Sequence, residues 1–400
     1  MQTQPIKPNV TLLLILMLLV IFCPLAIDIY LPAFPTIAEQ LFITEQQVQQ
    51  TVAIFMLTVG VGQLIAGPLA DKFGRKPVAV IGISLYAVSA LLAYYAPSFD
   101  ILMAARALQG LGACATFVVA FAIVRDKYGA QKSGQMITYL NGIVCFIPAL
   151  APLLGAWLTI QFGWRMNFMF LALFAIAGLF ITLFFFRETR PTDSYYQGHI
   201  LDIRRFLPII QTPVFLFNSL ICMLAMAAIL VFVTLAPGWI MTHLGGSVAD
   251  FTYWFTLNAV LSIVASFIAP IYIKRNSQNA LRMGISLLVF SGLLMLVLSP
   301  LHTAFYFMLP VLISALGFAL SLGSAAGMAL SSFPKQAGTA SALLGLMQMS
   351  GASVLVYLTH FLGFNAPSLI AFHLLLLVPL WLILITKKAH KLHPVKITHD

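Results

Sequence analysis

The chain has 400 residues, of which 61% are hydrophobic and only 8% are charged, and its formal net charge is +10. Apolar runs of about 20 residues, the length that crosses a bilayer, recur from end to end. This composition excludes a soluble globular domain and predicts an all-α integral membrane protein. The basic residues gather in loops on one side of the predicted spans, so their excess gives no reason to expect nucleic-acid binding.

Twelve segments are apolar and long enough to be transmembrane helices. They cover residues 11–34, 46–70, 78–96, 99–124, 134–160, 165–187, 212–236, 250–273, 280–299, 303–330, 337–361 and 366–386. The longest polar interval follows the sixth span. It predicts two pseudo-symmetric six-helix bundles, residues 1–190 and 212–400, with a cytoplasmic linker at 191–211 and a basic cytoplasmic tail.

The loops alternate in charge. Lysine and arginine fill every second loop and the tail, whereas the opposite loops hold acids and a single arginine, Arg165. The positive-inside rule therefore predicts that both termini are cytoplasmic.

Two charges fall well inside spans, away from the span ends. Asp28 lies in the first span, and Arg106 lies in the fourth, with Gln109 on the same helix face three residues later. An acid at mid-membrane costs roughly 2.5–3.5 kcal/mol, so such residues are functional candidates and often belong to proton relays. At 1.5 Å per residue, both charges lie at a similar depth. We predict that they approach each other or share a water-filled cavity; a static ion pair that only fixes helix packing is the alternative.

The turn between the second and third spans reads Gly67-Pro68-Leu69-Ala70-Asp71-Lys72-Phe73-Gly74-Arg75-Lys76-Pro77. Its glycines permit a tight turn, and its mixed charges suit a contact that opens and closes. Arg125-Asp126 ends the fourth span on the same side. We predict a conformational latch, and a solvated, snorkelling cluster is the alternative. The latch residues are Gly67, Asp71, Gly74, Arg75, Lys76, Arg125 and Asp126.

Two further local structures are predicted. Thr44 with Gln47 three residues later predicts a capping box at the start of the second span. In the fifth span Pro148 and Pro152 each remove a helical hydrogen bond and clear the neighbouring backbone, so this span, from Pro148 to Gly155, is predicted to bend.

A largely apolar cavity with a few hydrogen-bonding groups suits small molecules. Its candidate lining residues are polar and aromatic side chains within the spans. They are Tyr30, Gln109, Asn141, Phe146, Trp239, Asn258 and Gln348. Each of them can serve helix packing instead.

The sequence has no phosphate-binding loop, no metal-ligand cluster and no nucleophile with an ordered base. We therefore expect no enzyme activity, no cofactor and no bound metal.

Several of these segments resemble a known family. The string from Gly67 to Pro77 is similar to the loop motif of the major facilitator superfamily. Further segments resemble the bicyclomycin and chloramphenicol resistance branch of its twelve-helix drug:proton antiporters. They are Asp28 to Pro35, Arg106 to Gly112, Ile123 to Asp126, Pro148 to Gly155, Gly163 to Arg165, Arg187 to Thr189 and Ala337 to Ala342.

The resemblance implies a monomer in the cell inner membrane that exports small, fairly hydrophobic compounds in exchange for protons, with Asp28 gaining and losing a proton in each cycle. The first span lacks the second acid that some relatives carry, which leaves the acceptance of cations open. Two alternatives remain. One is an exporter dedicated to a single metabolite, such as a siderophore or a sugar, and the other is a passive facilitator, which would not need Asp28.

Overall fold

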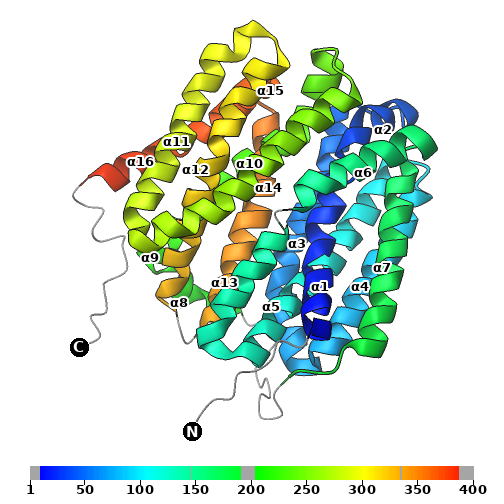
Figure 1. Ribbon diagram of the computed structural model, residues 1–400, viewed down its shortest axis with the longest axis vertical. Coiled ribbons are helices and arrows are strands. Elements are labelled where there is room, and N and C mark those ends of the chain that lie inside the picture. The colour runs from blue at the N-terminus through cyan, green and yellow to red at the C-terminus, as the bar shows by residue number, and fades with distance from the viewer. Residues whose placement is uncertain (1–9, 145, 191–202, 334–335, 387–400) are drawn as a thin grey trace.

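The computed structural model describes residues 10–144, 146–190, 203–333 and 336–386, and within them the side chains of 129–135, 137–139, 141–143 and 337 are left out. This part of the chain is helical and contains no strand (Figure 1). The helices are α1 (Val10–Asp28), η1 (Leu31–Ala33), α2 (Phe34–Gln40), α3 (Glu45–Phe73), α4 (Arg75–Tyr94), α5 (Phe99–Val144), α6 (Ile147–Phe162), α7 (Arg165–Phe185), η2 (Ile203–Phe206), α8 (Leu207–Ile210), α9 (Pro213–Pro237), η3 (Gly238–His243), α10 (Val248–Arg275), α11 (Ser277–Leu298), η4 (Ser299–Leu301), α12 (Ala304–Ser331), α13 (Ala337–Gly345), η6 (Leu346–Gly351), α14 (Ala352–His360), α15 (Ala366–Leu375) and α16 (Val378–Ile385).

Eleven helices of the described chain are long and apolar enough to cross a membrane, and α6 is a shorter apolar helix among them. This agrees with the predicted fold class. The predicted linker is described only in η2 and α8, and the basic tail lies beyond the described residues, so the domain boundaries stay a prediction.

The fourth and fifth spans differ from the prediction. They meet in one helix, α5, whose 46 residues would measure about 69 Å if straight, roughly twice the thickness of the bilayer core. The chain turns back within this length. Arg165, just after α6, donates a hydrogen bond of 3.2 Å from Nη2 to the carbonyl of Ala96, just before α5, so the end of α6 lies beside the start of α5. Helix α5 ends at Val144 and α6 begins at Ile147, because Pro148 in the first turn of α6 cannot continue the hydrogen-bond ladder of the preceding helix.

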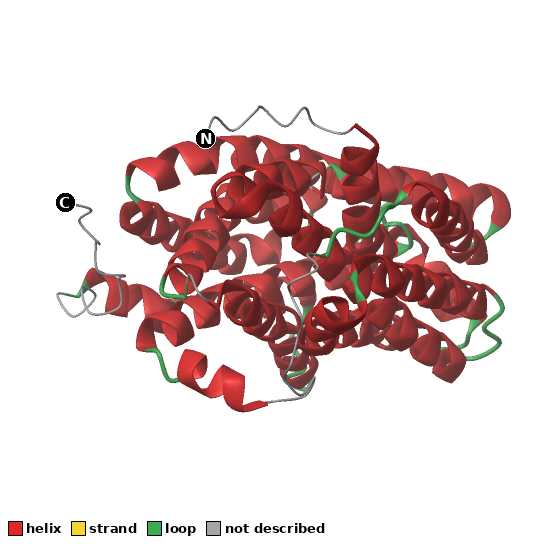
Figure 2. Cartoon of the chain, turned by 90° about the horizontal axis from the view of Figure 1, so that it is seen from below, coloured by secondary structure: helices red, strands yellow, loops and turns green. Residues whose placement is uncertain are grey.

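The helices form two sets that Figure 1 shows side by side, α1 to α7 in blue to green and α9 to α16 in green to red. Figure 2 looks along the spans from below and shows many of them end-on. Between the sets, α3 packs on α13, η6 and α14, and α6 packs on α10. These are contacts of the second span with the eleventh and of the fifth with the eighth. The second span corresponds to the eighth in the other repeat, and the eleventh corresponds to the fifth. The two contacts are therefore equivalent, as parallel repeats require.

Two faces of the molecule are defined by its loops. At the upper face of Figure 1, Trp164 Nε1 donates to Gln40 Oε1 over 2.9 Å, next to α2. At the lower face lies the turn from α3 to α4. The predicted capping box starts α3 at the upper face: the backbone N–H of Gln47 donates to Thr44 Oγ1 and that of Thr44 to Gln47 Oε1. This prediction is confirmed.

Candidate functional site

Asp28 is the last residue of α1 and is only 5% exposed. The helix stops there because Pro32, four residues on, has no N–H to donate, and the chain continues in the short helix η1. Among the described residues the Asp28 carboxyl makes no ion pair and no hydrogen bond. A buried carboxyl without these partners is costly when charged, so its surroundings favour a change of protonation or of partner.

The break after Asp28 is held by α6. Gly155 lies against the carbonyl oxygen of Ile29, and a Cβ at this position would overlap that oxygen. The glycine therefore lets α6 touch the backbone where α1 ends. Gly155 was predicted only as part of the bend of this span. The position of Asp28 depends on this contact.

Arg106 is fully buried in α5. Its Nε donates to the carbonyl of Thr51 over 3.3 Å, and its Nη1 donates to Gln109 Oε1. The guanidinium lies between two rings, 4.8 Å from the centroid of Tyr30 and 4.4 Å from that of Phe55. Aromatic faces stabilise a desolvated cation. Its Nη2 has no hydrogen-bond partner in the described chain, and neither has Gln109 Nε2, which leaves two buried donors unused.

Tyr30 connects the Asp28 segment to Arg106. It is fully buried, and its hydroxyl shares a 2.8 Å hydrogen bond with the Thr51 hydroxyl, which donates in turn to the carbonyl of Val48 over 2.6 Å. Its ring packs 5.3 Å from the ring of Phe168. Tyr30 is therefore fixed inside the first set of helices and reaches no solvent in this state.

The static ion pair of Asp28 and Arg106 is not formed, and their predicted approach stays a prediction. No ion pair joins them among the described residues, although Cys23 lies within electrostatic range of both. Their depth follows from counting residues along two helices, but the direction of each side chain depends on helix rotation, which counting cannot give. The shared cavity stays a prediction.

The other predicted substrate residues do not form one group. Gln109 joins Arg106, but Phe146 is 47% exposed at the start of α6, and the side chain of Asn141 lies outside the described residues. Trp239 stacks on His243 with ring centroids 3.9 Å apart, near the upper face. Asn258 and Gln348 are half-buried.

Sequence reasoning missed a seam between the two sets of helices. Ser353 Oγ donates to the carbonyl of Ala53 over 2.6 Å, and Ser350 Oγ donates to that of Leu57 over 2.7 Å. Farther up, the Thr242 hydroxyl donates to Glu45 Oε1. Small hydroxyl residues facing a helix backbone are the usual contacts between membrane helices, but they give no sequence signal of their partner.

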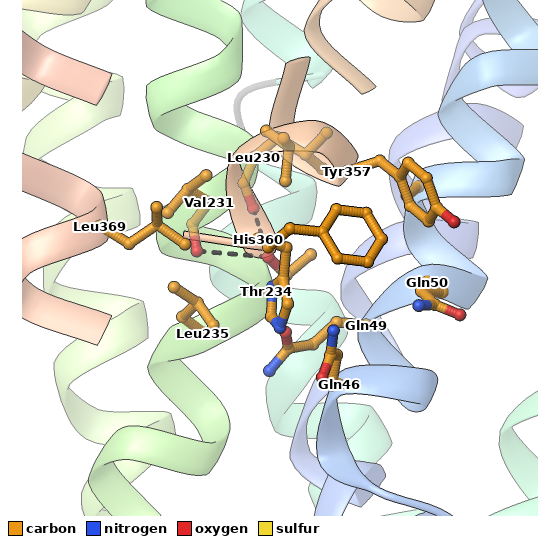
Figure 3. A pocket seen from close by; sticks show the side chains of 13 residues that line it. Gln46, Gln49, Gln50, Leu230, Val231, Thr234, Leu235, Tyr357, His360 and Leu369 are labelled. Atoms are coloured by element: carbon orange, nitrogen blue, oxygen red, sulfur yellow. Dashed lines mark hydrogen bonds between the residues drawn. The ribbon is translucent and has the colours of Figure 1, made fainter. Parts of the chain in front are cut away.

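A small pocket opens along this seam, with a volume of about 30 Å³. Figure 3 shows the side chains of Gln46 and Gln49 from α3 near His360 from α14. Its lining residues are Gln46, Gln49, Gln50, Ala53, Leu230, Val231, Thr234, Leu235, Val356, Tyr357, His360, Phe361 and Leu369. None of the predicted substrate residues lines it, and its volume suffices for only one or two water molecules.

At the lower face, Arg75 joins the end of α3 and the start of α4 to the middle of α5. Its Nε donates to Asp126 Oδ2 over 2.8 Å, and its Nη1 pairs with Asp71 one turn back in the chain. Gly74 turns the chain with φ +108°, which an L side chain rarely adopts, and a Cβ there would lie 2.5 Å from Glu188 Oε2. Five of the predicted latch residues, Asp71, Gly74, Arg75, Lys76 and Asp126, are thus brought together.

Glu188, after the sixth span, completes this cluster and was not among the predicted latch residues. Its carboxylate accepts the backbone N–H groups of Arg75 and Lys76 over 2.9 and 3.0 Å. Partial burial raises the pKa of Glu188, but hydrogen bonds from the backbones of Arg190, Arg75, Lys76 and Thr189 outweigh it, and the net pKa lies below its ordinary value. A lone acid among arginines at 187–190 was the available sequence signal.

The remaining two latch residues behave differently. Arg125 is exposed, and its Nη1 lies 3.2 Å from where a Cβ of Gly338 would be, so it contacts the other set of helices. A Cβ at Gly67 would meet nothing within 4 Å, so close helix packing does not require this glycine.

The described residues contain no group of three or more His, Cys, Asp or Glu side chains able to hold a metal ion. These residues form twelve apolar helices in two repeated sets, with buried charges on α1 and α5. This arrangement defines a helical membrane transporter.

Comparison with known proteins gives the family. The model of the Major Facilitator Superfamily matches residues 16–356, and the chain belongs to this family. Its members are transporters, and the chain is not an enzyme. The multidrug resistance proteins MdtL of Escherichia coli O157:H7 and of Shigella boydii are each 32% identical to it over 353 residues, which cover 87% of this chain and 88% of theirs.

Solved structures show the same fold. The crystal structure of a D-xylose-proton symporter superposes with a TM-score of 0.77 at 15% identity, covering 95% of this chain and 98% of its own. The human organic anion transporter MFSD10 gives a TM-score of 0.72 at 18% identity, covering 95% and 100%. The predicted fold class is confirmed. The chain is a multi-pass membrane protein.

Proposed function

We propose that this protein exports small hydrophobic drugs, of the chloramphenicol and bicyclomycin type, in exchange for protons by alternating access. Three findings support the proposal: membership of a transporter family, 32% identity to proteins named for multidrug resistance, and two buried charges in one set of helices. Bacterial relatives and the positive loops favour the cell inner membrane with both termini in the cytoplasm. A monomer suffices because one chain supplies both halves of the cavity.

The observation that carries the proposal is the buried Asp28 carboxyl, which ends α1 without an ion pair or hydrogen bond in the described chain. We infer that it releases a proton to the cytoplasm when substrate binds and regains one from outside. An inward proton charge at 100 mV supplies roughly 2.3 kcal/mol, which sustains a substrate gradient of about 40-fold. One titrating carboxyl is therefore sufficient for useful export.

Arg106 acts in this cycle as the cation that responds to Asp28. When Asp28 is charged, the unused Nη2 donor of Arg106 has an anion to turn toward, and when Asp28 is protonated, the arrangement with Tyr30 and Phe55 is favoured. The substrate cavity would then change shape with the proton, because Tyr30 and Gln109 both contact Arg106. Asn141, Phe146, Trp239, Asn258 and Gln348 remain candidates for the rest of its wall.

The lower cluster around Arg75 serves as the latch of alternating access. The halves that move are residues 1–190 and 212–400, connected by 191–211. The cluster ties the end of α3 and the start of α4 to the middle of α5 and to the segment after α7, and Arg125 meets Gly338 of the other set. The hydroxyl contacts of Ser350 and Ser353 must break when the upper side opens.

The test is uphill transport in vesicles with an imposed proton gradient, using neutral chloramphenicol, cationic ethidium and a sugar in separate arms. We expect chloramphenicol to be moved uphill, and Asp28→Asn to abolish uphill movement. Asp100→Asn, which removes an exposed acid at the upper end of α5, is the matched control and should transport normally. Transport of the sugar alone would favour a dedicated metabolite exporter, and a fully active Asp28→Asn would indicate a passive facilitator.

A further inference from the structure

The turn between α10 and α11 carries positive charge, and no ion pair joins it to an acid of the described residues. Lys274 and Arg275 end α10 at the lower face, and Arg275 is exposed and makes no ion pair or hydrogen bond with the described residues. After Asp250, at the upper end of α10, the sequence contains no acid until Asp400. The described residues from 251 to 386 therefore offer this turn no anion. An anion from outside these residues would complete the turn.

The turn also forms a cavity of about 360 Å³, large enough for a phosphate-bearing group. It is lined by Tyr272, Arg275, Asn276, Asn279, Ala280 and Met283. Asn276 uses its Oδ1 to cap α11, accepting the N–H of Asn279 over 3.0 Å, so its amide NH₂ remains a donor. Asn279 supplies a second amide and Arg275 a planar guanidinium, which matches phosphate oxygens in pairs. The lining thus combines one cation with neutral donors and no competing acid.

The apolar residues beside the cavity indicate where its ligand comes from. Ile271 is 69% exposed, and Tyr272 and Met283 are exposed on the same pair of helices. On spans of a membrane protein such side chains face lipid, and an exposed tyrosine beside basic residues is typical of the headgroup level. A free anion would gain nothing from this apolar rim, whereas the acyl chains of a phospholipid would cover it.

We propose that the α10–α11 turn binds the headgroup of an anionic phospholipid of the lower leaflet. The phosphodiester accepts from Arg275 and Asn279 inside the cavity, Lys274 adds long-range attraction, and the acyl chains lie along Ile271 and Met283. The first turn of α11 contributes a smaller favourable field through its helix dipole. This binding is independent of Asp28 and of the transported substrate.

The test compares wild-type protein with Arg275→Gln and with Asn279→Ala, each purified in a neutral detergent. The matched control is Arg187→Gln, which removes an exposed arginine from the lower face of the first set, away from the cavity. Three probes are added in separate arms: phosphatidylglycerol, zwitterionic phosphatidylcholine, and inorganic phosphate. Native mass spectrometry counts bound lipid, and the melting temperature gives the apparent affinity.

We expect phosphatidylglycerol to bind and protect the wild type and Arg187→Gln equally, and phosphatidylcholine to do neither. Arg275→Gln should bind it about fivefold more weakly, which corresponds to about 1 kcal/mol per basic residue near an anionic surface. Asn279→Ala should also weaken the binding of phosphatidylglycerol, although the positive charge of Arg275 is kept. Equal binding by all four proteins would overturn the proposal, and so would equal protection by inorganic phosphate, which would make this a free-anion site.

Discussion

Two arginines of the first set of helices are buried in opposite ways. Arg75, at the lower face, holds Asp71 and Asp126 with its side chain and reaches Glu188 through its backbone N–H. Arg106, inside α5, contacts no carboxylate in the described chain. Its partners are two neutral oxygens and two aromatic rings, and one of its donors is unused.

The difference separates a fixed charge from a responsive one. A buried cation paired with two carboxylates stabilises a single arrangement of the helices that carry them. Removing the cation or the carboxylates leaves an unpaired buried charge. A buried cation with an unused donor near a partnerless acid has a second arrangement available to it, which a proton on that acid can select. We therefore assign locking to Arg75 and coupling to Arg106.

After Asp28→Asn, the largest effect on activity is expected from Arg106→Gln. Without the cation, deprotonated Asp28 loses the partner it turns to, and uphill transport should fall at least about tenfold, the equivalent of 1.4 kcal/mol. Stability should change little, because the loss of ring contacts is offset by relief from burying a charge. Uphill transport is measured in vesicles, and stability is measured by denaturant unfolding in detergent. Normal transport by Arg106→Gln would remove this residue from the coupling.

Arg75→Gln should show the reverse pattern. It leaves Asp126, whose side chain is only 9% exposed, without its charged partner, and we expect the free energy of unfolding to fall by about 3–5 kcal/mol. Lys72→Gln, in the same turn but exposed, should change it by less than about 0.5 kcal/mol. If the two variants unfold alike, the Arg75 cluster is a solvated surface group and no latch.

Gly155→Ala tests the backbone contact that positions Asp28. Its Cβ overlaps the carbonyl of Ile29, and relieving this overlap should cost about 1–3 kcal/mol and displace the end of α1. Gly67→Ala is the control, because a Cβ at this position meets nothing within 4 Å. Replacing a glycine inside a helix should be neutral or should stabilise the protein by up to about 1 kcal/mol. The free energy of unfolding is measured for both variants. Equal values would contradict the close contact between Gly155 and Ile29.

The smallest effect is expected from Glu188→Gln, and it depends on pH. The folded pKa of Glu188 is depressed, so its stabilisation is present above the unfolded value of about 4.3 and is lost as pH falls through the lower folded value. The melting temperature of the wild type should exceed that of Glu188→Gln near neutral pH, and the gap should close below about pH 4. A gap of constant size across this range would exclude a role for the Glu188 charge.

The sequence predicted what depends on local pattern. Apolar runs gave the spans, Thr44 and Gln47 gave a cap, and Asp28 and Arg106 stood out because charges are rare in apolar helices. Each of these features follows from residue types a few positions apart in one helix.

What the sequence could not predict depends on contacts between distant helices. Glu188 reaches Arg75 across 113 positions, and Ser353 reaches the carbonyl of Ala53 across 300, which no periodicity encodes. The rotation of α1 against α5 decides whether Asp28 faces Arg106, and packing sets that rotation. The continuous helix α5 was missed because polar residues between two spans suggest a loop, although they are compatible with a helical turn.

Proton release from purified protein on addition of chloramphenicol tests the exchange of proton for substrate most directly. In weakly buffered detergent solution the wild type should release up to one proton per bound drug molecule, Asp100→Asn should do the same, and Asp28→Asn should bind drug and release none. Drug binding by the wild type without proton release, or equal release by Asp28→Asn, would contradict the role of Asp28.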